Sequence, residues 1–254
     1  MINKPGTLYL IPTPLGRNAD QTGLPADTLR IIKSVSHFAV ENLKNAVSFL
    51  KFCEHPTPEF ELFFYSLDKN TPAREVHSYL DVLKQGHDLG VLTDAGCPGI
   101  ADPGAMMAGL AHQQGFRVIP LVGPSSILLA LMASGLNGQQ FAFSGYLPIE
   151  LKKRRSALSE LEKRSSRHRE TQIFMEAPYR NLELFKDILE ICNASTLLCV
   201  ASNLTMPDEY IATKTVAAWK SDAPPDIDKK PAIFLIHAEN LLQSASKSTK
   251  KRRY

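Results

Sequence analysis

The chain has 254 residues, 44% hydrophobic and 22% charged, which is ordinary for a globular protein of one or two domains. Its four cysteines show no C-x-x-C spacing and its seven histidines no metal-ligand spacing, so we expect neither a metal site nor a redox dithiol. No apolar run approaches the roughly 20 residues of a membrane span, and the N-terminus lacks an apolar signal core. We therefore expect a cytoplasmic protein without a membrane partner.

The net charge of +3 is unevenly distributed along the chain. The segment Leu151–Arg169 holds eight Lys or Arg residues against two Glu, and Ser244–Tyr254 holds five and no acid. Such segments suit an anionic partner such as RNA. Each is equally typical of a solvated helix face or a soluble tail.

Strands and helices alternate through the first half of the chain. Apolar runs predict strands at Thr7–Ile11, His37–Val40, Phe63–Tyr65, Leu89–Leu92 and Arg117–Pro120. Helical patterns lie at residues 27–34, 41–52, 71–85 and 103–114. This alternation predicts an α/β domain with a mainly parallel sheet.

Two of these strands end in turns rich in proline and glycine. One turn is Pro12–Gly16, and the other lies within Gly90–Gly104, which contains four glycines and two prolines. Ligands bind at the carboxyl ends of strands in open α/β sheets, and glycine lets the backbone approach them closely. We expect Asp102 to cap the following helix, with Pro103 as its first residue. Further on, Ser125 is placed to cap a helix at 127–134, whose free N–H groups favour a carboxylate.

The second half alternates again and predicts a second α/β domain with a mixed sheet. Strands are expected at residues 141–143, 172–175, 196–201, 210–213 and 231–236, and helices at 151–169, 179–191 and 215–220. We place an N-terminal domain at 1–121, a C-terminal domain at 122–238 and a basic, disordered tail at 239–254. The chain has no Walker loop, no G-x-G-x-x-G after its first strand and no G-x-S-x-G elbow. The residues alone support two tandem α/β domains with a small-molecule cleft between them.

Several segments also resemble one family. Asp94–Gly104 reads D-A-G-C-P-G-I-A-D-P-G, which is similar to the D-A-G-T-P-G-I-S-D-P-G signature of the tetrapyrrole methylase superfamily. Tyr9–Gly16, Gly123–Ser126, Phe143–Pro148 and Phe174–Arg180 resemble further motifs of its ribosomal RNA branch, which methylates the ribose 2′-oxygen in the small subunit, and they occur in the same order. The likeness runs from Thr7 to about His237.

The resemblance implies a methyltransferase, usually a homodimer, that binds S-adenosylmethionine between two α/β domains. It implies that the donor is bound by Pro14 and Leu15 of the first loop and by Asp94, Gly96, Cys97 and Ile100 of the second. It also implies that Ser125 and Ser126 contact the methionine end of the donor. It matches the adenosine pocket to Met175, Leu204 and Ala232. Several of these side chains are equally consistent with plain packing, and Cys97 stands where the family has Thr, so we assign it no nucleophilic role.

Departures from the ribosomal RNA pattern bear on the acceptor. The family segment E-D-T-R is E-N-L-K at Glu41–Lys44, and K-G-E is K-P-A at Lys230–Ala232. A base would assist methylation of a weakly acidic hydroxyl, and Glu41 and Glu176 are the candidates. The basic helix Leu151–Arg169 and the tail are expected to contact RNA. Two alternatives stay open: a tetrapyrrole-like acceptor, and a non-catalytic RNA-binding protein on the same fold.

Overall fold

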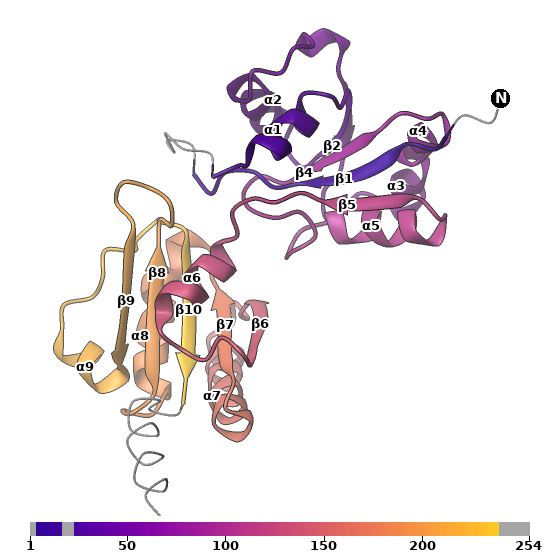
Figure 1. Cartoon of the computed structure of the whole chain (residues 1–254). Helices are drawn as coiled ribbons and strands as arrows, with labels where there is room; N and C mark the ends of the chain where they lie inside the picture. Colours follow the sequence, from indigo (N-terminus) through magenta and orange to yellow (C-terminus); the bar gives the residue numbers. More distant parts are fainter. Residues whose placement is uncertain (1–3, 17–22, 239–254) are drawn as a thin grey trace, which may run out of the picture. The chain divides into compact units, whose positions relative to one another are not determined.

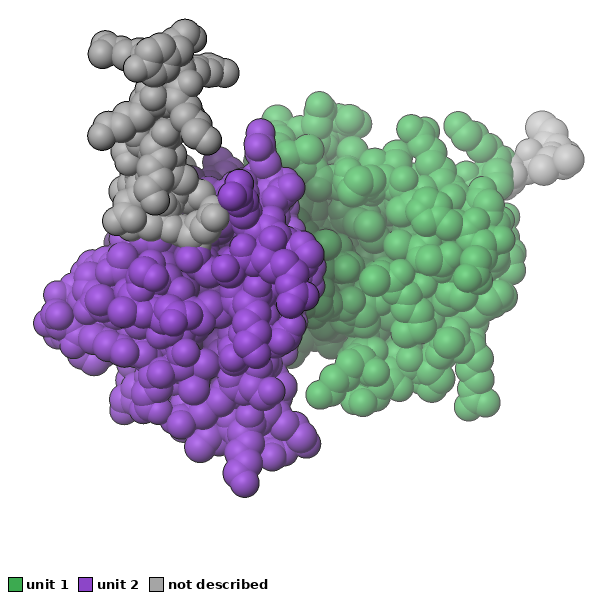
Figure 2. Space-filling view, turned by 90° about the horizontal axis from the view of Figure 1, so that it is seen from below, with its two compact units in different colours: residues 1–125 green, residues 126–254 purple. Residues whose placement is uncertain are grey.

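A computed structural model describes residues 4–16 and 23–238, so the predicted tail at 239–254 lies outside the described residues. The chain separates into two compact units, Met1–Ser125 and Ser126–Tyr254, which are coloured green and purple in Figure 2. Each unit has its own five-stranded sheet and its own hydrophobic core (Figure 1). The sequence-based boundary at residues 121 and 122 lies shortly before this division.

Unit 1 is built on a fully parallel sheet in the order β3-β2-β4-β1-β5. Its strands are β1 (Thr7–Ile11), β2 (His37–Val40), β3 (Phe63–Ser66), β4 (Leu89–Leu92) and β5 (Arg117–Pro120). Its helices are α1 (Ala26–Ile32), α2 (Leu43–Phe52), η1 (Glu59–Glu61), α3 (Ala73–Tyr79), α4 (Asp81–Lys84) and α5 (Gly104–Gln113). The prediction of a mainly parallel first sheet is confirmed.

Helices cover both faces of this sheet, because alternate strand residues point to opposite sides. Leu8 of β1 belongs to a core cluster with Val76 and Met107 from α3 and α5. Ile11 of the same strand belongs to a second cluster with Ile32 and Phe49 from α1 and α2. Figure 1 shows α1 and α2 on one side of the sheet and α3 and α5 on the other.

Three predicted helix boundaries in unit 1 are wrong, each for a local reason. Helix α2 begins at Leu43 rather than Glu41, because Asn42 is extended and its side chain accepts a hydrogen bond from the Asn45 amide. The single helix expected at 71–85 is broken at Leu80, where Leu80 N bonds to His77 O as in a 3₁₀ turn. Helix α5 begins at Gly104, so Pro103 lies just before it.

Unit 2 contains a mixed sheet in the order β6-β7-β10-β8-β9, in which only the β6–β7 pair is parallel. Its strands are β6 (Phe141–Tyr146), β7 (Thr171–Met175), β8 (Leu197–Ser202), β9 (Tyr210–Thr215) and β10 (Ala232–His237). Its helices are α6 (Ser126–Ser134), α7 (Leu151–His168), η2 (Pro178–Arg180), α8 (Asn181–Ile191) and α9 (Val216–Ser221). Helix α6 lies on one face and α7 and α8 on the other (Figure 1), so the predicted mixed sheet is confirmed.

The amino ends of β2 and β3 carry a stacked aromatic group that includes a titratable histidine, His37. The His37 ring stacks on Phe63 at 4.5 Å between centroids and lies 5.2 Å from His87, and its Nδ1 is 3.1 Å from the Tyr65 hydroxyl. Burial and then the charge of His87 lower the pKa of His37 below its ordinary value of 6.5. The folded state therefore favours neutral His37.

We expect this stability to be complete above about pH 6.5 and to decline as the pH falls from there through the lowered pKa, because the unfolded chain binds a proton that the folded chain resists. His37→Phe should keep the stack and shrink that decline. Thermal melts of both proteins between pH 5 and pH 8 check this. An unchanged dependence of the melting temperature on pH in the variant would rule out His37 as its source.

Candidate functional site

The two predicted ligand loops of unit 1 lie side by side. They follow β1 and β4, which are neighbours in the sheet. Thr13 N donates to Gly96 O at 2.9 Å, and Gly96 N donates to Thr13 O at 3.1 Å. The Thr13 hydroxyl also donates to Thr93 O at 3.2 Å. The first and second loops therefore form one continuous structure at the carboxyl edge of the sheet.

The second loop keeps its shape through glycine and one carboxylate. Gly96 and Gly99 both have φ of +82°, a left-handed conformation that side chains disfavour. Asp102 Oδ1 accepts hydrogen bonds from Gly99 N and Gly104 N, each at 2.7 Å. Asp102 thus braces the loop and caps the first turn of α5, while Ile100 is exposed beside it.

Behind the second loop, Glu41 and Asn45 hold Asp94. Glu41 Oε2 accepts from the Asp94 amide at 3.3 Å and from the Thr93 hydroxyl at 3.4 Å. Asn45 Nδ2 donates to Asp94 Oδ1 at 3.0 Å. Burial raises the pKa of Glu41, and the Asp94 amide opposes that shift by stabilising the ionised form. Asp94 itself is exposed, and its Oδ2 accepts no hydrogen bond from any residue that the structure describes.

On the other side of the second loop, Cys97 contacts the segment that leads out of unit 1. Its Sγ donates to Pro124 O at 3.4 Å, and it makes a side-chain hydrogen bond with Ser125. Burial raises the pKa of the Cys97 thiol, so the nucleophilic thiolate is disfavoured at neutral pH. The structure thus brings predicted residues Gly96, Cys97 and Ser125 together, whereas Ser126 begins helix α6.

A cavity of about 400 Å³ opens where the loops meet helix α2. One part of its wall is Pro14, Leu15 and Asp94, all predicted from the sequence. Lys44, which ends the segment Glu41–Lys44 that the sequence tied to the acceptor, also lines the cavity. Sequence reasoning missed the rest of the α2 wall, formed by Asn45, Ala46, Ser48, Phe49 and Phe52. The available signal was the spacing of Lys44, Ser48 and Phe52 at i, i+4 and i+8, which puts them on one helical face.

The three predicted residues of unit 2 lie at the same end of its three central strands, β7, β10 and β8. Met175 ends β7 beside Ile233, while Ala232 begins β10 beside Ser202. Asn203 N and the Ser202 hydroxyl both bond to Pro231 O, so the turn carrying buried Leu204 is tied to the start of β10. Met175, Leu204 and Ala232 therefore contribute apolar side chains at this end of the strands.

Polar atoms without partners lie at the same end of β7. Glu176 and Asn181 are buried, and Glu176 Oε2 and Asn181 Oδ1 accept no hydrogen bond from any described residue. Glu176 Oε1 accepts from Arg180 and from the Ala177 amide. Buried unpaired acceptors are costly in a native protein, so each calls for a hydrogen-bond donor such as an ordered water or a bound ligand. Since Arg180 forms an ion pair with Glu176, that carboxylate is better suited to bind a ligand than to remove a proton from the methyl acceptor.

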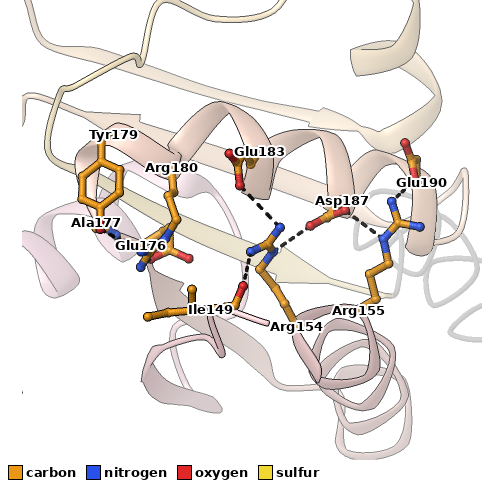
Figure 3. A network of polar contacts seen from close by, with 10 residues as sticks. All are labelled: Ile149, Arg154, Arg155, Glu176, Ala177, Tyr179, Arg180, Glu183, Asp187 and Glu190. Carbon is orange, nitrogen blue, oxygen red and sulfur yellow. Dashed lines mark hydrogen bonds and ion pairs between the residues drawn. The ribbon is translucent and has the colours of Figure 1, made fainter. Parts of the chain in front are cut away.

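Part of the positive charge of helix α7 is paired with carboxylates of unit 2 itself. Figure 3 shows the guanidinium of Arg154 between Asp187 Oδ2 at 2.7 Å and Ile149 O at 3.0 Å. Arg155 binds Asp187 Oδ1 at 2.9 Å and also Glu190 (Figure 3). The helix is consequently a weaker basic surface than its composition indicates. Cations that stay exposed and make no ion pair with any described residue are Lys152, Lys163 and Arg167.

Comparison with known proteins identifies the family. The model of the tetrapyrrole (corrin/porphyrin) methylases matches residues 7–219. The chain belongs to this family. It is 31% identical over 252 residues to the ribosomal RNA small subunit methyltransferase I of Buchnera aphidicola subsp. Schizaphis graminum, covering 98% of this chain and 84% of the relative. The Bacillus subtilis protein of the same name is 36% identical over 219 residues, covering 85% and 71%. This tetrapyrrole methylase therefore falls in the ribosomal RNA branch.

Solved structures agree on the fold. The methyltransferase CobJ has a TM-score of 0.59 at 15% identity and covers 91% of this chain and 92% of its own. Uroporphyrin-III-C-methyltransferase from Thermus thermophilus has a TM-score of 0.52 at 18% identity, with 92% of each chain covered. Identities this low support the architecture only.

As a tetrapyrrole methylase, the chain is an enzyme that uses S-adenosylmethionine as its methyl donor. The residues present fit that donor. In unit 1 the glycine loop offers backbone groups rather than a phosphate cradle, and Asp94 offers a carboxylate to a positively charged sulfur. Over residues 4–16 and 23–238, no cluster of side chains suits a metal ion and no helix has the length and apolarity to span a membrane.

Proposed function

We propose that this enzyme methylates a ribose 2′-hydroxyl of small-subunit ribosomal RNA. The relatives in the same branch carry the name ribosomal RNA small subunit methyltransferase I. The observation that carries the proposal is the joining of the two donor loops by the Thr13–Gly96 hydrogen bonds, next to a cavity with room for an acceptor. The 2′-oxygen as the methylated atom follows from the resemblance of the loop motifs to those of the ribosomal RNA branch.

The residues divide the work by their chemistry. When bound, the donor supplies a methyl group on a positively charged sulfur. In unit 1, Pro14, Leu15, Gly96, Cys97 and Ile100 shape the donor loops, and Asp94 presents acceptor oxygens. Ser125 and Ser126 offer hydroxyl and amide donors to a carboxylate. In unit 2, Met175, Leu204 and Ala232 form an apolar surface for adenine, and the free oxygens of Glu176 and Asn181 accept from hydroxyl groups. Holding the acceptor in line is the main catalytic contribution.

The charge of the cavity favours RNA over a tetrapyrrole-like acceptor. Such an acceptor carries many carboxylates and calls for several cations in the wall. Of the described residues that line the cavity, Lys44 alone is cationic. One cation matches one phosphate of an RNA chain. Glu41 does not line the cavity, so we assign it the positioning of Asp94 and leave the base without a residue.

Further parts of the proposal concern the assembly and its location. We propose RNA contact through the exposed cations of α7 and through the tail, a homodimer, and a cytoplasmic location. Exposed apolar side chains of unit 2, Leu128, Met132, Tyr146 and Ile149, are suited to a contact between two copies. Equilibrium sedimentation of the full chain tests the homodimer, and a monomer at micromolar concentration would contradict it.

Ribosomal RNA from a deletion strain tests the proposed activity. Mass spectrometry should find one ribose methylation lost from the small-subunit RNA, and restored by the wild-type gene but not by a variant that fails to bind the donor. Identical modification maps with and without the protein would overturn the RNA acceptor. Binding to RNA without transfer of a labelled methyl group would instead indicate a non-catalytic protein.

A further inference from the structure

We propose that the cavity between helix α2 and the donor loops receives one unstacked nucleotide of the RNA acceptor, and that Phe52 and Lys44 select it. This inference rests on the proposed function and names the acceptor part of the same site. The α2 wall belongs to no donor motif, whereas the opposite wall holds Pro14, Leu15 and Asp94. Because one wall comes from α2 and the other from the donor loops, an acceptor bound in the cavity would lie next to those loops.

Phe52 provides a surface for stacking a base. It is 53% exposed although it is a phenylalanine, and it lines the cavity. Ala46, Phe49 and Leu50 anchor α2 in the core, whereas Phe52 is not a member of that core cluster, so the fold does not require a ring at position 52. Proteins that read single-stranded RNA stack unpaired bases on aromatic rings in this way.

Lys44 and Asn45 provide the polar part of the same face. Lys44 is exposed and lies about two helical turns before Phe52. No residue in the described part of the chain forms an ion pair with it. Its ammonium group therefore suits an RNA phosphate. Asn45 donates to Asp94 Oδ1 at 3.0 Å, and both residues line the cavity. Aromatic surface, cation and acceptor oxygen together match a nucleotide.

The size of the cavity agrees with a single occupant of this kind. Its volume of about 400 Å³ lies at the lower end of small-molecule sites, which span roughly 300–1,000 Å³. A base-paired nucleotide within a helix would not enter it, since its base is stacked on both faces. We therefore expect the acceptor nucleotide to be unpaired or flipped out when it is methylated.

The test measures labelled-methyl transfer onto small ribosomal subunits purified from a strain that lacks this protein. Phe52→Ala and Lys44→Ala are each compared with wild type and with a matched control. Phe60 is 85% exposed and does not line the cavity, so Phe60→Ala controls for loss of an exposed ring. Lys69→Ala controls for loss of an exposed lysine. Donor affinity is measured by calorimetry on every variant.

We expect Phe52→Ala to raise the KM for subunits roughly tenfold, as loss of one base–ring stack predicts, with donor affinity within about twofold of wild type. Lys44→Ala should also raise KM, more strongly at low salt. Phe52→Tyr should restore KM, which a purely structural role would not require. Variants that match their controls, or that lose donor affinity instead, would overturn the inference while leaving the enzyme's proposed function intact. No transfer by wild type would overturn both.

Discussion

Replacing Asp187 with alanine is expected to destabilise unit 2 by about 3 kcal/mol or more. The side chains of Asp187 and Arg154 are each 5% exposed, and their 2.7 Å ion pair joins helices α7 and α8 (Figure 3). Without Asp187, buried Arg154 keeps the Ile149 carbonyl and, at 3.7 Å, the 65% exposed carboxylate of Glu183. A buried charge that has lost its close buried partner costs far more than an exposed pair, so the free energy of unfolding falls sharply.

Urea unfolding of the variant measures this loss, and Glu190→Ala is the matched control. Glu190 is 58% exposed and pairs with Arg155, which is itself 37% exposed, so its removal should change the unfolding midpoint far less. Replacing Arg154 by methionine and Asp187 by leucine together should recover much of the stability, because neither charge is then left unpaired. Equal midpoints for Asp187→Ala and Glu190→Ala would refute a structural role for the buried pair.

Gly96→Ala is expected to weaken donor binding about 5- to 30-fold without unfolding the protein. Gly96 has φ of +82°, and a side chain there costs roughly 1–2 kcal/mol. An added Cβ lies 3.4 Å from Leu15 Cδ2, which is ordinary contact, so the cost is one of backbone conformation. The loop can relax away from the Thr13 bridge, and binding must then restore it, which lowers the apparent affinity.

Gly138→Ala is the control for this loop variant. Gly138 has no heavy atom within 4 Å of an added Cβ and is not in the left-handed region. Calorimetric titration of both variants with S-adenosylmethionine should show weaker binding for Gly96→Ala only. Wild-type affinity in Gly96→Ala would mean that the second loop does not need its observed conformation to bind the donor.

The strands were predictable because burial on both faces requires nearly continuous apolar runs, as at His37–Val40 and Leu89–Leu92. Helix boundaries were less predictable, since Asn42 caps α2 through a side-chain bond and Leu80 breaks α3 from α4 inside an unbroken helical pattern. Local patterns give the type of an element more reliably than its ends.

The parts of the candidate site that consist of sequence motifs were predictable. The parts that depend on contacts between residues far apart in the sequence were not. The loops at Pro14 and Asp94 follow from strand ends and glycines, and the structure joins them through Gly96. By contrast, the composition of α7 indicates a basic face, whereas Asp187 on another helix binds two of its arginines. In the sequence, Phe52 is indistinguishable from the buried apolar residues of its helix, and only the structure shows that it is exposed.

This chain is expected to bind S-adenosylmethionine at the loops after β1 and β4. Calorimetric titration of the folded, full-length protein with S-adenosylmethionine tests it most directly. We expect saturable binding with one donor per chain, weakened by Gly96→Ala and unaffected by Phe52→Ala. The absence of binding heat at several temperatures, with circular dichroism confirming a folded protein, would contradict it.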